Sequence, residues 1–258
     1  MLKKRIIPKF LIRGGRLVKM RRFFDDQREA GNPVSTAKVY NSYGVDELIF
    51  VDIDASAEGR LLDGKIIERV SEEIFAPLTA GGGVKTLAQI EALLKSGADK
   101  VSVNSTAIDD PGFVTQAASR FGDQCIVVSI DYKQDADGRK RVYGYGGTVA
   151  TGHDPVEFAL RMQDLHAGEI LMTSIDRDGM MSGYDLDIIH ALSSRLDIPL
   201  IASSGAGSLD DCRKALEAGA SAITISSMFI FSDHSPIKVR TYLNTNGIHV
   251  RSQKGIRS

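Results

Sequence analysis

The chain has 258 residues, of which 43% are hydrophobic and 25% charged, and its formal net charge is −1. This composition is typical of a folded globular protein and excludes collagen, coiled coils and disordered chains. The near-neutral charge argues against a nucleic-acid or membrane-surface binder. Cys125 and Cys212 are too few for a disulfide framework and lack zinc-site spacing. The N-terminal apolar run is too short for a signal peptide or membrane span, so we expect a cytoplasmic protein.

Eight short segments rich in β-branched residues recur along the chain, and each is followed by an amphipathic stretch. Most are continuous apolar runs, which are typical of parallel strands covered on both faces. Helical stretches such as TLAQIEALLKSGA end near a glycine. Eight βα units in a chain of this length predict a (β/α)8 TIM barrel. The predicted strands are Arg5–Ile12, Glu47–Ile53, Pro77–Ala80, Lys100–Asn104, Cys125–Asp131, Glu169–Ile175, Pro199–Ala202 and Ala222–Ser226.

An internal repeat supports this barrel. The segment Pro77–Ser105 aligns without gaps with Pro199–Ser227, at an offset of 122 residues (199 minus 77). A period this long is unlike that of a solenoid and indicates duplication of a half-barrel. An open doubly wound sheet, the main alternative, predicts neither the repeat nor eight evenly spaced units. We therefore expect one domain over 1–258, with half-barrels over about 1–122 and 123–250.

Glycines and small hydroxyl residues follow equivalent strands in the two halves. The third strand runs into Gly81–Gly83, and the seventh into Ser203–Gly207. In barrels of this type the functional groups lie in the loops after the strands. Glycine lets backbone N–H groups approach an anion closely, and hydroxyls add donors. One such turn alone would be a tight βα connection, but two related copies predict a ligand with a phosphate at each end.

Carboxylates also follow several predicted strands. Asp54 and Asp176 lie in turn-like sequences, where capping or turn formation explains them at least as well as catalysis. Asp131 ends a strongly apolar run, where a carboxylate is unfavourable unless it has a role. We therefore predict that Asp131 is a catalytic acid or base. The five histidines show no metal-ligand spacing, so we expect no metal and no cofactor.

The motifs RIIP, DELIFVDIDAS, GGGVK, GADKVSVNS, AGEILMTSIDRDG, IASSGAG and GIHVR resemble HisF, the cyclase subunit of imidazole glycerol phosphate synthase. The resemblance runs from Lys4 to about Arg251. It implies a lyase and cyclase subunit of a glutamine amidotransferase in histidine biosynthesis. Ammonia from a separate, HisH-like glutaminase would be added to a bis-phosphorylated aminoimidazole intermediate.

The same resemblance assigns roles to individual residues. Lys19 matches a lysine of a mobile first loop, and Asp131 matches one of two catalytic aspartates. An ammonia gate at the bottom of the barrel would comprise Arg5, Glu47, Lys100 and Glu169, with Asp99 beside it on the glutaminase-docking surface. The phosphate sites would comprise Gly82, Asn104 and Ser105 in one half and Asp178, Gly179, Gly205, Ser226 and Ser227 in the other.

The chain departs from the family pattern on its first strand. The second catalytic aspartate should lie at position 11, where this chain has Leu11. Leucine cannot exchange a proton, so a mechanism with two acids is incomplete. Lys9 replaces the family's usual small residue, and Ser204 replaces a glycine.

These departures resemble a second HisF branch that is associated with lipopolysaccharide and other surface-polysaccharide genes. That resemblance implies an ammonia conduit that works with a glutaminase and a sugar-modifying amidotransferase to supply nitrogen for an acetamidino group. We expect this role, and the alternative is an authentic cyclase-lyase of histidine biosynthesis. A phosphoribosyl isomerase would need acids on both the first and the fifth strand, so Leu11 disfavours it.

Overall fold

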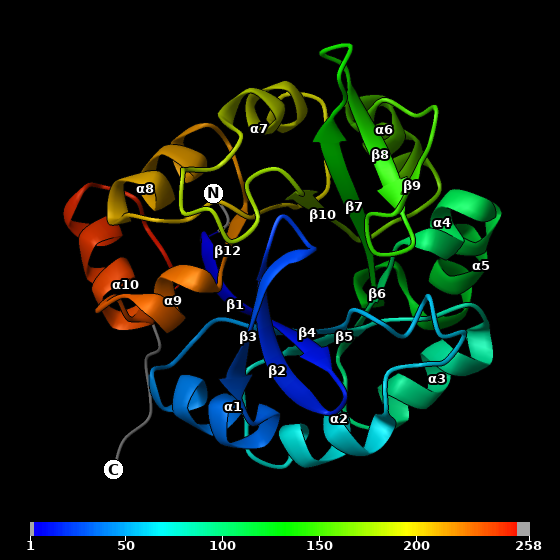
Figure 1. The fold of residues 1–258 in the computed structure, drawn as a ribbon, viewed down its shortest axis with the longest axis horizontal. Helices are drawn as coiled ribbons and strands as arrows, with labels where there is room; N and C mark the ends of the chain where they lie inside the picture. Colours follow the sequence, from blue (N-terminus) through cyan, green and yellow to red (C-terminus); the bar gives the residue numbers. More distant parts are fainter. Residues whose placement is uncertain (1–2, 252–258) are drawn as a thin grey trace.

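The computed structural model describes residues 3–251 and contains a closed barrel of parallel strands. The strands follow the order β10-β11-β12-β1-β4-β5-β6-β7, and pairing between β7 and β10 closes the ring. Figure 1 shows the helices arranged around these strands. The predicted (β/α)8 barrel is therefore confirmed. Its strands are β1 (Arg5–Arg13), β4 (Leu48–Asp52), β5 (Leu78–Gly81), β6 (Lys100–Val103), β7 (Ile126–Gln134), β10 (Glu169–Ser174), β11 (Leu200–Ser203) and β12 (Ala222–Ile225).

Eight helices of eight to ten residues cover the outside of the barrel. They are α1 (Pro33–Ser42), α2 (Gly64–Ser71), α3 (Leu87–Lys95), α5 (Gly112–Phe121), α6 (Pro155–Asp164), α7 (Leu186–Ser193), α8 (Leu209–Glu217) and α10 (Pro236–Thr245). Two short helices, α4 (Ser105–Asp109) and α9 (Ser227–Phe231), follow β6 and β12, and a 3₁₀ turn, η1 (Asp123–Cys125), precedes β7. Thr86 and Ser208 begin α3 and α8 with the same capping box, which satisfies otherwise unpaired N–H groups.

The two halves of the barrel repeat one another element by element. The bounds of α1, α2, α3 and α4 recur in α6, α7, α8 and α9 after a shift of 122 residues, as do those of β5 and β6 in β11 and β12. The offset found in the sequence is therefore a structural period. The domain limits, 1–258 with half-barrels over 1–122 and 123–250, stay a prediction, because residues 1–2 and 252–258 lie outside the described part.

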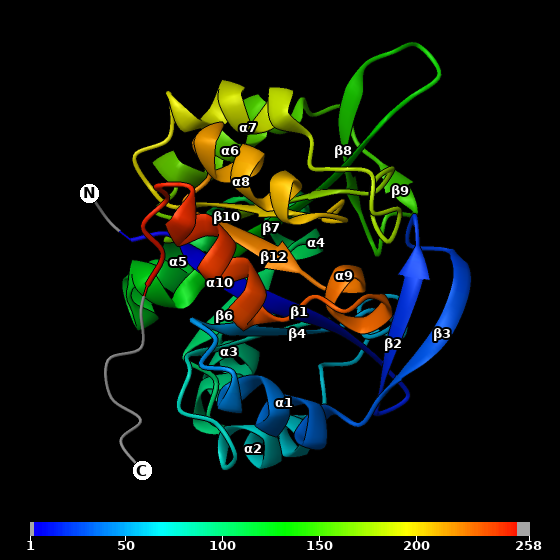
Figure 2. The same cartoon turned by 90° about the vertical axis from the view of Figure 1, so that its left-hand side faces the viewer.

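Each half also carries an antiparallel hairpin that the sequence analysis did not predict. The first is β2 (Arg16–Arg21) with β3 (Asp25–Gly31), and the second is β8 (Lys140–Gly144) with β9 (Val149–Ala150). Figure 2 shows both hairpins at the same end of the barrel. Strand β7 extends to Gln134 to pair with β8, so the prediction that Asp131 ends its strand was wrong.

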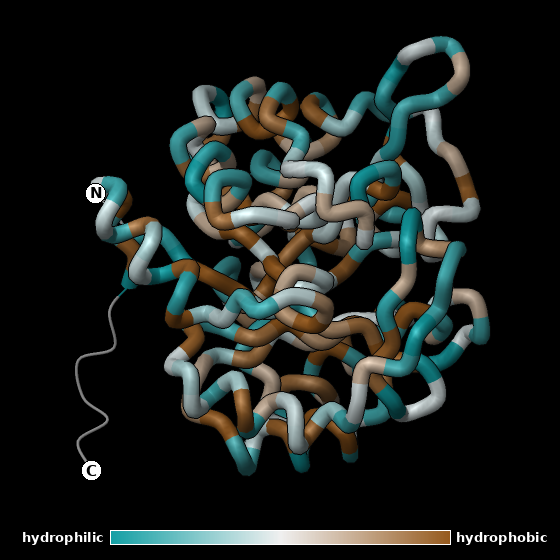
Figure 3. Tube along the Cα trace, turned by 60° about the vertical axis from the view of Figure 1, so that its left-hand side comes forward, coloured by the Kyte–Doolittle hydropathy of each residue, from teal (hydrophilic) through white to brown (hydrophobic). Residues whose placement is uncertain are grey.

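The apolar residues form two separate clusters. The larger one fills the space between the strands and the surrounding helices. The smaller one lies inside the barrel and consists of the fully buried residues Ile7, Ile49, Val127, Leu171, Ile201 and Ala222. Figure 3 shows the apolar residues concentrated along the interior of the molecule. Within residues 3–251, no helix has the length and apolar character needed to cross a membrane.

Gly168 tests how tightly the bottom loops of the barrel are packed. A Cβ at this position would lie 1.9 Å from the carbonyl oxygen of Asp123, whereas a Cβ at Gly152 would meet no atom within 4 Å. We expect Gly168→Ala to lower the free energy of unfolding by about 1–3 kcal/mol or more, because the backbone must shift. Gly152→Ala should leave it within about 1 kcal/mol. Equal effects of the two variants in denaturant unfolding would contradict this packing.

Candidate active site

The carboxyl ends of the barrel strands surround a pocket with about 350 Å³ of free volume. Its wall includes Asp131, Gly82, Asn104 and Ser105 from the strand ends and their loops. These residues come from β5, β6 and β7 or follow them directly. The structure therefore brings the predicted acid to the predicted first phosphate site. We call Gly82, Asn104 and Ser105 the first loop cluster.

The backbone of the first loop cluster requires glycine at position 82. Gly82 has a φ of +123°, and a Cβ there would lie 2.5 Å from the carbonyl oxygen of Asp52. Asn104 donates from Nδ2 to the carbonyl oxygen of Ser129, and more weakly, at 3.4 Å, to Oδ2 of Asp131. The Ser105 hydroxyl accepts the backbone N–H of Tyr145 at 2.9 Å. The cluster is thus connected to the catalytic candidate by a direct hydrogen bond.

A second pocket lies at the opposite side of the mouth. Its lining contains every residue of the second predicted phosphate site. Its free volume is only about 20 Å³, enough for about one water molecule. Gly205 matches Gly83 by the repeat, and the counterpart of Gly82 is Ser204. Gly205 has a φ of +103°, and a Cβ there would lie 2.1 Å from the carbonyl oxygen of Gly183. We call this set the second loop cluster: Asp178, Gly179, Gly205, Ser226 and Ser227.

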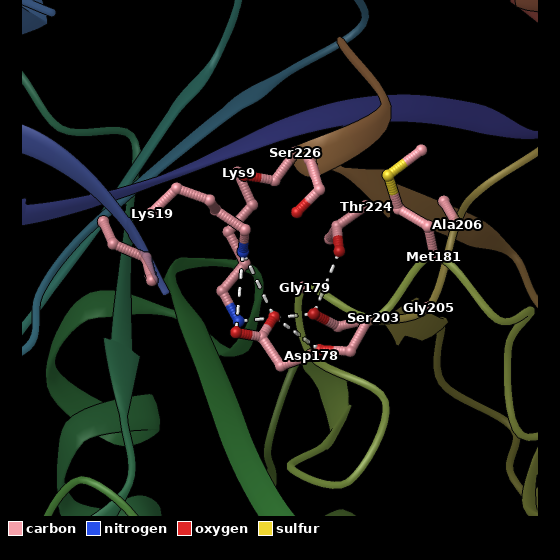
Figure 4. A pocket seen from close by; sticks show the side chains of 13 residues that line it. Lys9, Lys19, Asp178, Gly179, Met181, Ser203, Gly205, Ala206, Thr224 and Ser226 are labelled. Carbon is pink, nitrogen blue, oxygen red and sulfur yellow. Dashed lines mark hydrogen bonds and ion pairs between the residues drawn. The ribbon is translucent and has the colours of Figure 1, made fainter. Parts of the chain in front are cut away.

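Asp178 is the centre of the polar contacts in the second loop cluster. It lies 3.3 Å from Nζ of Lys19 and accepts a hydrogen bond from the Ser204 hydroxyl at 3.0 Å. Figure 4 shows Lys19 at Asp178, with Lys9 reaching toward the same carboxylate. Lys19 lies in β2, within the segment that follows the first barrel strand, and is 4% exposed. Ser204 has a φ of +78°, a conformation that is unfavourable for a residue with a side chain.

Asp131 has the properties of a group that exchanges protons near neutral pH. Its carboxyl group faces the pocket and is 9% exposed. Burial raises its pKa to about 6, although Lys9 and a hydrogen bond from Thr173 act in the opposite direction. A pKa in this range is that of an efficient general acid or base.

The first strand supplies two residues to the mouth. Lys9 and Leu11 both line the two pockets. Nζ of Lys9 lies 3.3 Å from Oγ1 of Thr173 and 3.2 Å from Oγ of Ser203. Leu11 occupies the wall where a second acid was expected, and it offers no group that can exchange a proton.

The predicted gate residues form a closed ring of charges at the opposite end of the bore. NH1 of Arg5 lies 2.8 Å from Glu47 and 3.0 Å from Glu169, and Nζ of Lys100 lies 2.9 Å and 3.1 Å from the same two residues. The hydroxyl of Thr79 donates to Glu47 at 2.7 Å. Burial opposes the charge of Arg5, but the two glutamates outweigh it and raise its pKa. We call these four charged residues the charged ring.

The other strand-end acids have structural partners. Asp54 forms two hydrogen bonds with the Arg13 guanidinium, at 2.7 and 2.8 Å, on the wall of the large pocket. Asp176 accepts the backbone N–H of Gln134 at 2.9 Å. Asp176 therefore has a structural partner at the end of β7. No local sequence pattern indicates that Arg13 pairs with Asp54.

Some lining residues were missed because no local pattern marks them. Phe23, Phe24 and Tyr145 belong to the loops of the two hairpins and line the large pocket. Their participation depends on how these hairpins fold over the mouth. Among residues 3–251 there is no group of three or more His, Cys, Asp or Glu side chains that could hold a metal ion.

Fold and site together define a (β/α)8-barrel protein with an acid between two glycine-rich loop clusters. A family model described as "Histidine biosynthesis protein" matches residues 5–235. The imidazole glycerol phosphate synthase subunit HisF of Dehalococcoides mccartyi is 46% identical over 252 residues, which are 97% of this chain and 99% of that protein. The HisF subunit of Alkaliphilus metalliredigens is 45% identical over 97% of this chain and 100% of its own. The chain therefore belongs to the HisF family of histidine-biosynthesis proteins, and the predicted resemblance is confirmed at this level.

Asp131 should destabilise the folded state above about pH 4, and to its full extent above about pH 6. Its pKa of about 6 lies above the ordinary value near 4, so unfolding releases a carboxylate into water wherever the pH exceeds the unfolded pKa. We expect Asp131→Asn to raise the free energy of unfolding by about 3 kcal/mol at pH 8, and the gain to vanish below pH 4, where the carboxyl is protonated in both states.

Denaturant unfolding at pH 8 and pH 3.5 checks this expectation. The exposed Asp197 supplies the control, because Asp197→Asn should change stability little at either pH. A loss of stability in Asp131→Asn at pH 8 would show that the carboxylate is held by favourable contacts.

Proposed function

We propose that this chain is the cyclase subunit of an imidazole glycerol phosphate synthase, working in the cytoplasm with a separate glutaminase. The single observation that carries the proposal is the layered bore. A closed charged ring lies at one end, a fully buried apolar layer in the middle, and Asp131 between two loop clusters at the mouth. The family relationship supports it, since the relatives described above are named as subunits of this synthase.

In this function the bore separates neutral ammonia from charged species. The apolar layer disfavours ammonium and other ions because burying an unpaired charge in an apolar environment is very unfavourable. Ammonia would enter when the charged ring opens and would leave at the mouth near Lys9 and Asp131. Asp131, with a pKa of about 6, would transfer protons during ammonia addition and ring closure.

The two loop clusters would hold the phosphates of a bis-phosphorylated substrate. Gly82 and Gly205 let the backbone approach the ligand, and Asn104, Ser105, Ser226 and Ser227 add polar groups. The first loop cluster borders the large pocket, which has room for a ligand. At the second loop cluster an arriving phosphate would compete with Asp178 for Lys19, so we expect local rearrangement there on binding.

The glutaminase would dock on the end that carries the charged ring. Asp99 precedes Lys100 of this ring in the sequence. Its side-chain carboxylate accepts a hydrogen bond from the backbone N–H of Leu78 at 2.8 Å. Phe75, in the loop between α2 and β5, is 95% exposed. An exposed phenylalanine at this end supplies the kind of apolar anchor that protein interfaces use.

Leu11 favours a second candidate function. Without a second acid, the barrel would serve as an ammonia conduit for a sugar-modifying amidotransferase that builds an acetamidino group on a surface polysaccharide. Lys9 and Ser204, the other departures, lie at the same mouth. This candidate needs the charged ring but not cyclisation, so the two functions predict different activities for the purified barrel.

Turnover with free ammonia separates the two functions. Purified protein is given ammonium and the bis-phosphorylated aminoimidazole intermediate, and release of the aminoimidazole carboxamide ribotide is followed. The cyclase function predicts turnover that Asp131→Asn lowers at least about 100-fold. A wild-type protein that does not turn over, but gains activity in Leu11→Asp, would support the conduit and contradict the cyclase.

Lys100→Met tests the charged ring. Without Lys100, Glu47 and Glu169 lose one of the two cations that neutralise them. Removing one partner from a buried ionic network strongly destabilises the arrangement of the remaining charges. We expect glutamine-dependent turnover with the glutaminase to fall at least about tenfold relative to turnover with free ammonia. Lys95→Met, at a side chain that is 76% exposed on α3, should leave the ratio unchanged. An unchanged ratio in Lys100→Met would show that ammonia does not pass through the charged ring.

A further inference from the structure

Lys9 places a primary amine in the middle of the mouth. It lines both the large pocket and the small one, so it lies between the two loop clusters. Its amine contacts the hydroxyl groups of Thr173 and Ser203 at 3.3 and 3.2 Å. Within residues 3–251 it forms no ion pair of 4.0 Å or less. The amine is therefore held in place by neutral groups and is not neutralised by a direct carboxylate contact.

The surroundings of Lys9 favour its neutral, nucleophilic form. Burial lowers the pKa of Lys9 and the nearby Lys19 lowers it further, while Asp131 and Asp178 act in the opposite direction. A lysine that is removed from water and lies near a second cation is a known arrangement for a nucleophilic amine. In Figure 4 the side chains of Lys9 and Lys19 both extend toward Asp178.

We propose that Lys9 forms an imine with the carbonyl carbon of a phosphorylated ketose bound between the two loop clusters. The amine is reached from either pocket, so a ketose held by its phosphate at one cluster would present its carbonyl to Lys9. Leu11, two residues further along the same strand and 9% exposed, would cover the imine with an apolar side chain. Asp131 supplies the proton donor on the same wall.

The step conserves atoms and electrons. The Lys9 nitrogen pair attacks the carbonyl carbon, the carbon–oxygen π bond breaks, and the oxygen takes a proton from the Asp131 carboxyl group to give a carbinolamine. Loss of this hydroxyl as water, with one proton from the nitrogen, leaves the carbon–nitrogen double bond. The net change is condensation of one amine with one ketone and release of one water, with no oxidant or reductant.

This imine also explains how the mouth could use ammonia without an acid at position 11, an extension that rests on the proposed function. Ammonia would add to the protonated imine carbon, and the Lys9 amine would then leave, which transfers the imine to the substrate. A protonated imine is more electrophilic than a ketone, so the carbonyl needs no second acid to activate it. Lys9 and Leu11 would then be two parts of one change in mechanism.

Borohydride trapping tests the imine on the wild-type chain. The protein is incubated at pH 7 with ribulose 5-phosphate, reduced with sodium borohydride and mapped by peptide mass spectrometry. We expect one stable adduct per chain, on Lys9, absent in Lys9→Met and suppressed by ribitol 5-phosphate, which keeps the phosphate and lacks the carbonyl. Adducts spread over exposed lysines such as Lys95, with none on Lys9, would overturn the proposal.

Calorimetry with the same probe separates failure of the imine from failure of the proposed function. Binding without an adduct on Lys9 overturns the imine but still supports the phosphate sites of the proposed function. Lys9 would then act as an ionic contact for the ligand. Absence of binding overturns both. Ammonium chloride added at pH 8.5 before reduction should lower the yield on Lys9 several-fold relative to sodium chloride. An equal yield in the two salts would overturn the transfer of the imine to ammonia.

Discussion

Closure of the eight strands into a barrel directs alternate residues of each strand into one narrow bore, and the rest of the structure depends on how these positions are filled. The bore is charged at one end, apolar in the middle and polar at the mouth. The charged ring is possible because four side chains of opposite sign alternate around it and satisfy one another. The apolar layer above it is closed in this structure, so a small neutral molecule could cross only as the layer fluctuates.

The mouth is symmetric in its backbone and asymmetric in its chemistry. The two loop clusters descend from the same repeat. Its equivalent glycines, Gly83 and Gly205, both have positive φ and leave no room for a Cβ beside a backbone carbonyl oxygen. The first loop cluster borders about 350 Å³ of free volume, whereas the second borders about 20 Å³. At the second loop cluster, Lys19 and Ser204 both contact Asp178. The strained backbone of Ser204 is thus associated with a polar contact that glycine could not make.

A single strand carries the departures that matter most for chemistry. Lys9 brings an amine into the bore, and Leu11 places an apolar side chain on the wall where the resemblance predicts a second acid. Asp131 is left as the acid between the loop clusters, in a buried position that raises its pKa. A scaffold that accepts a destabilising carboxylate at this point is consistent with selection for function over stability.

The sequence by itself determined the eight strands, the period of 122 residues and the positions of both loop clusters. Apolar runs, helix caps and glycines are local signals, and the repeat doubled each of them. Only the tertiary structure decided that Lys19 is buried against Asp178, that Lys9 lies between Thr173 and Ser203, and that Arg13 pairs with Asp54. These contacts join residues 41 to 194 positions apart. They arise only when barrel closure and the folding of the hairpins bring distant strands together, which no local pattern of residues encodes.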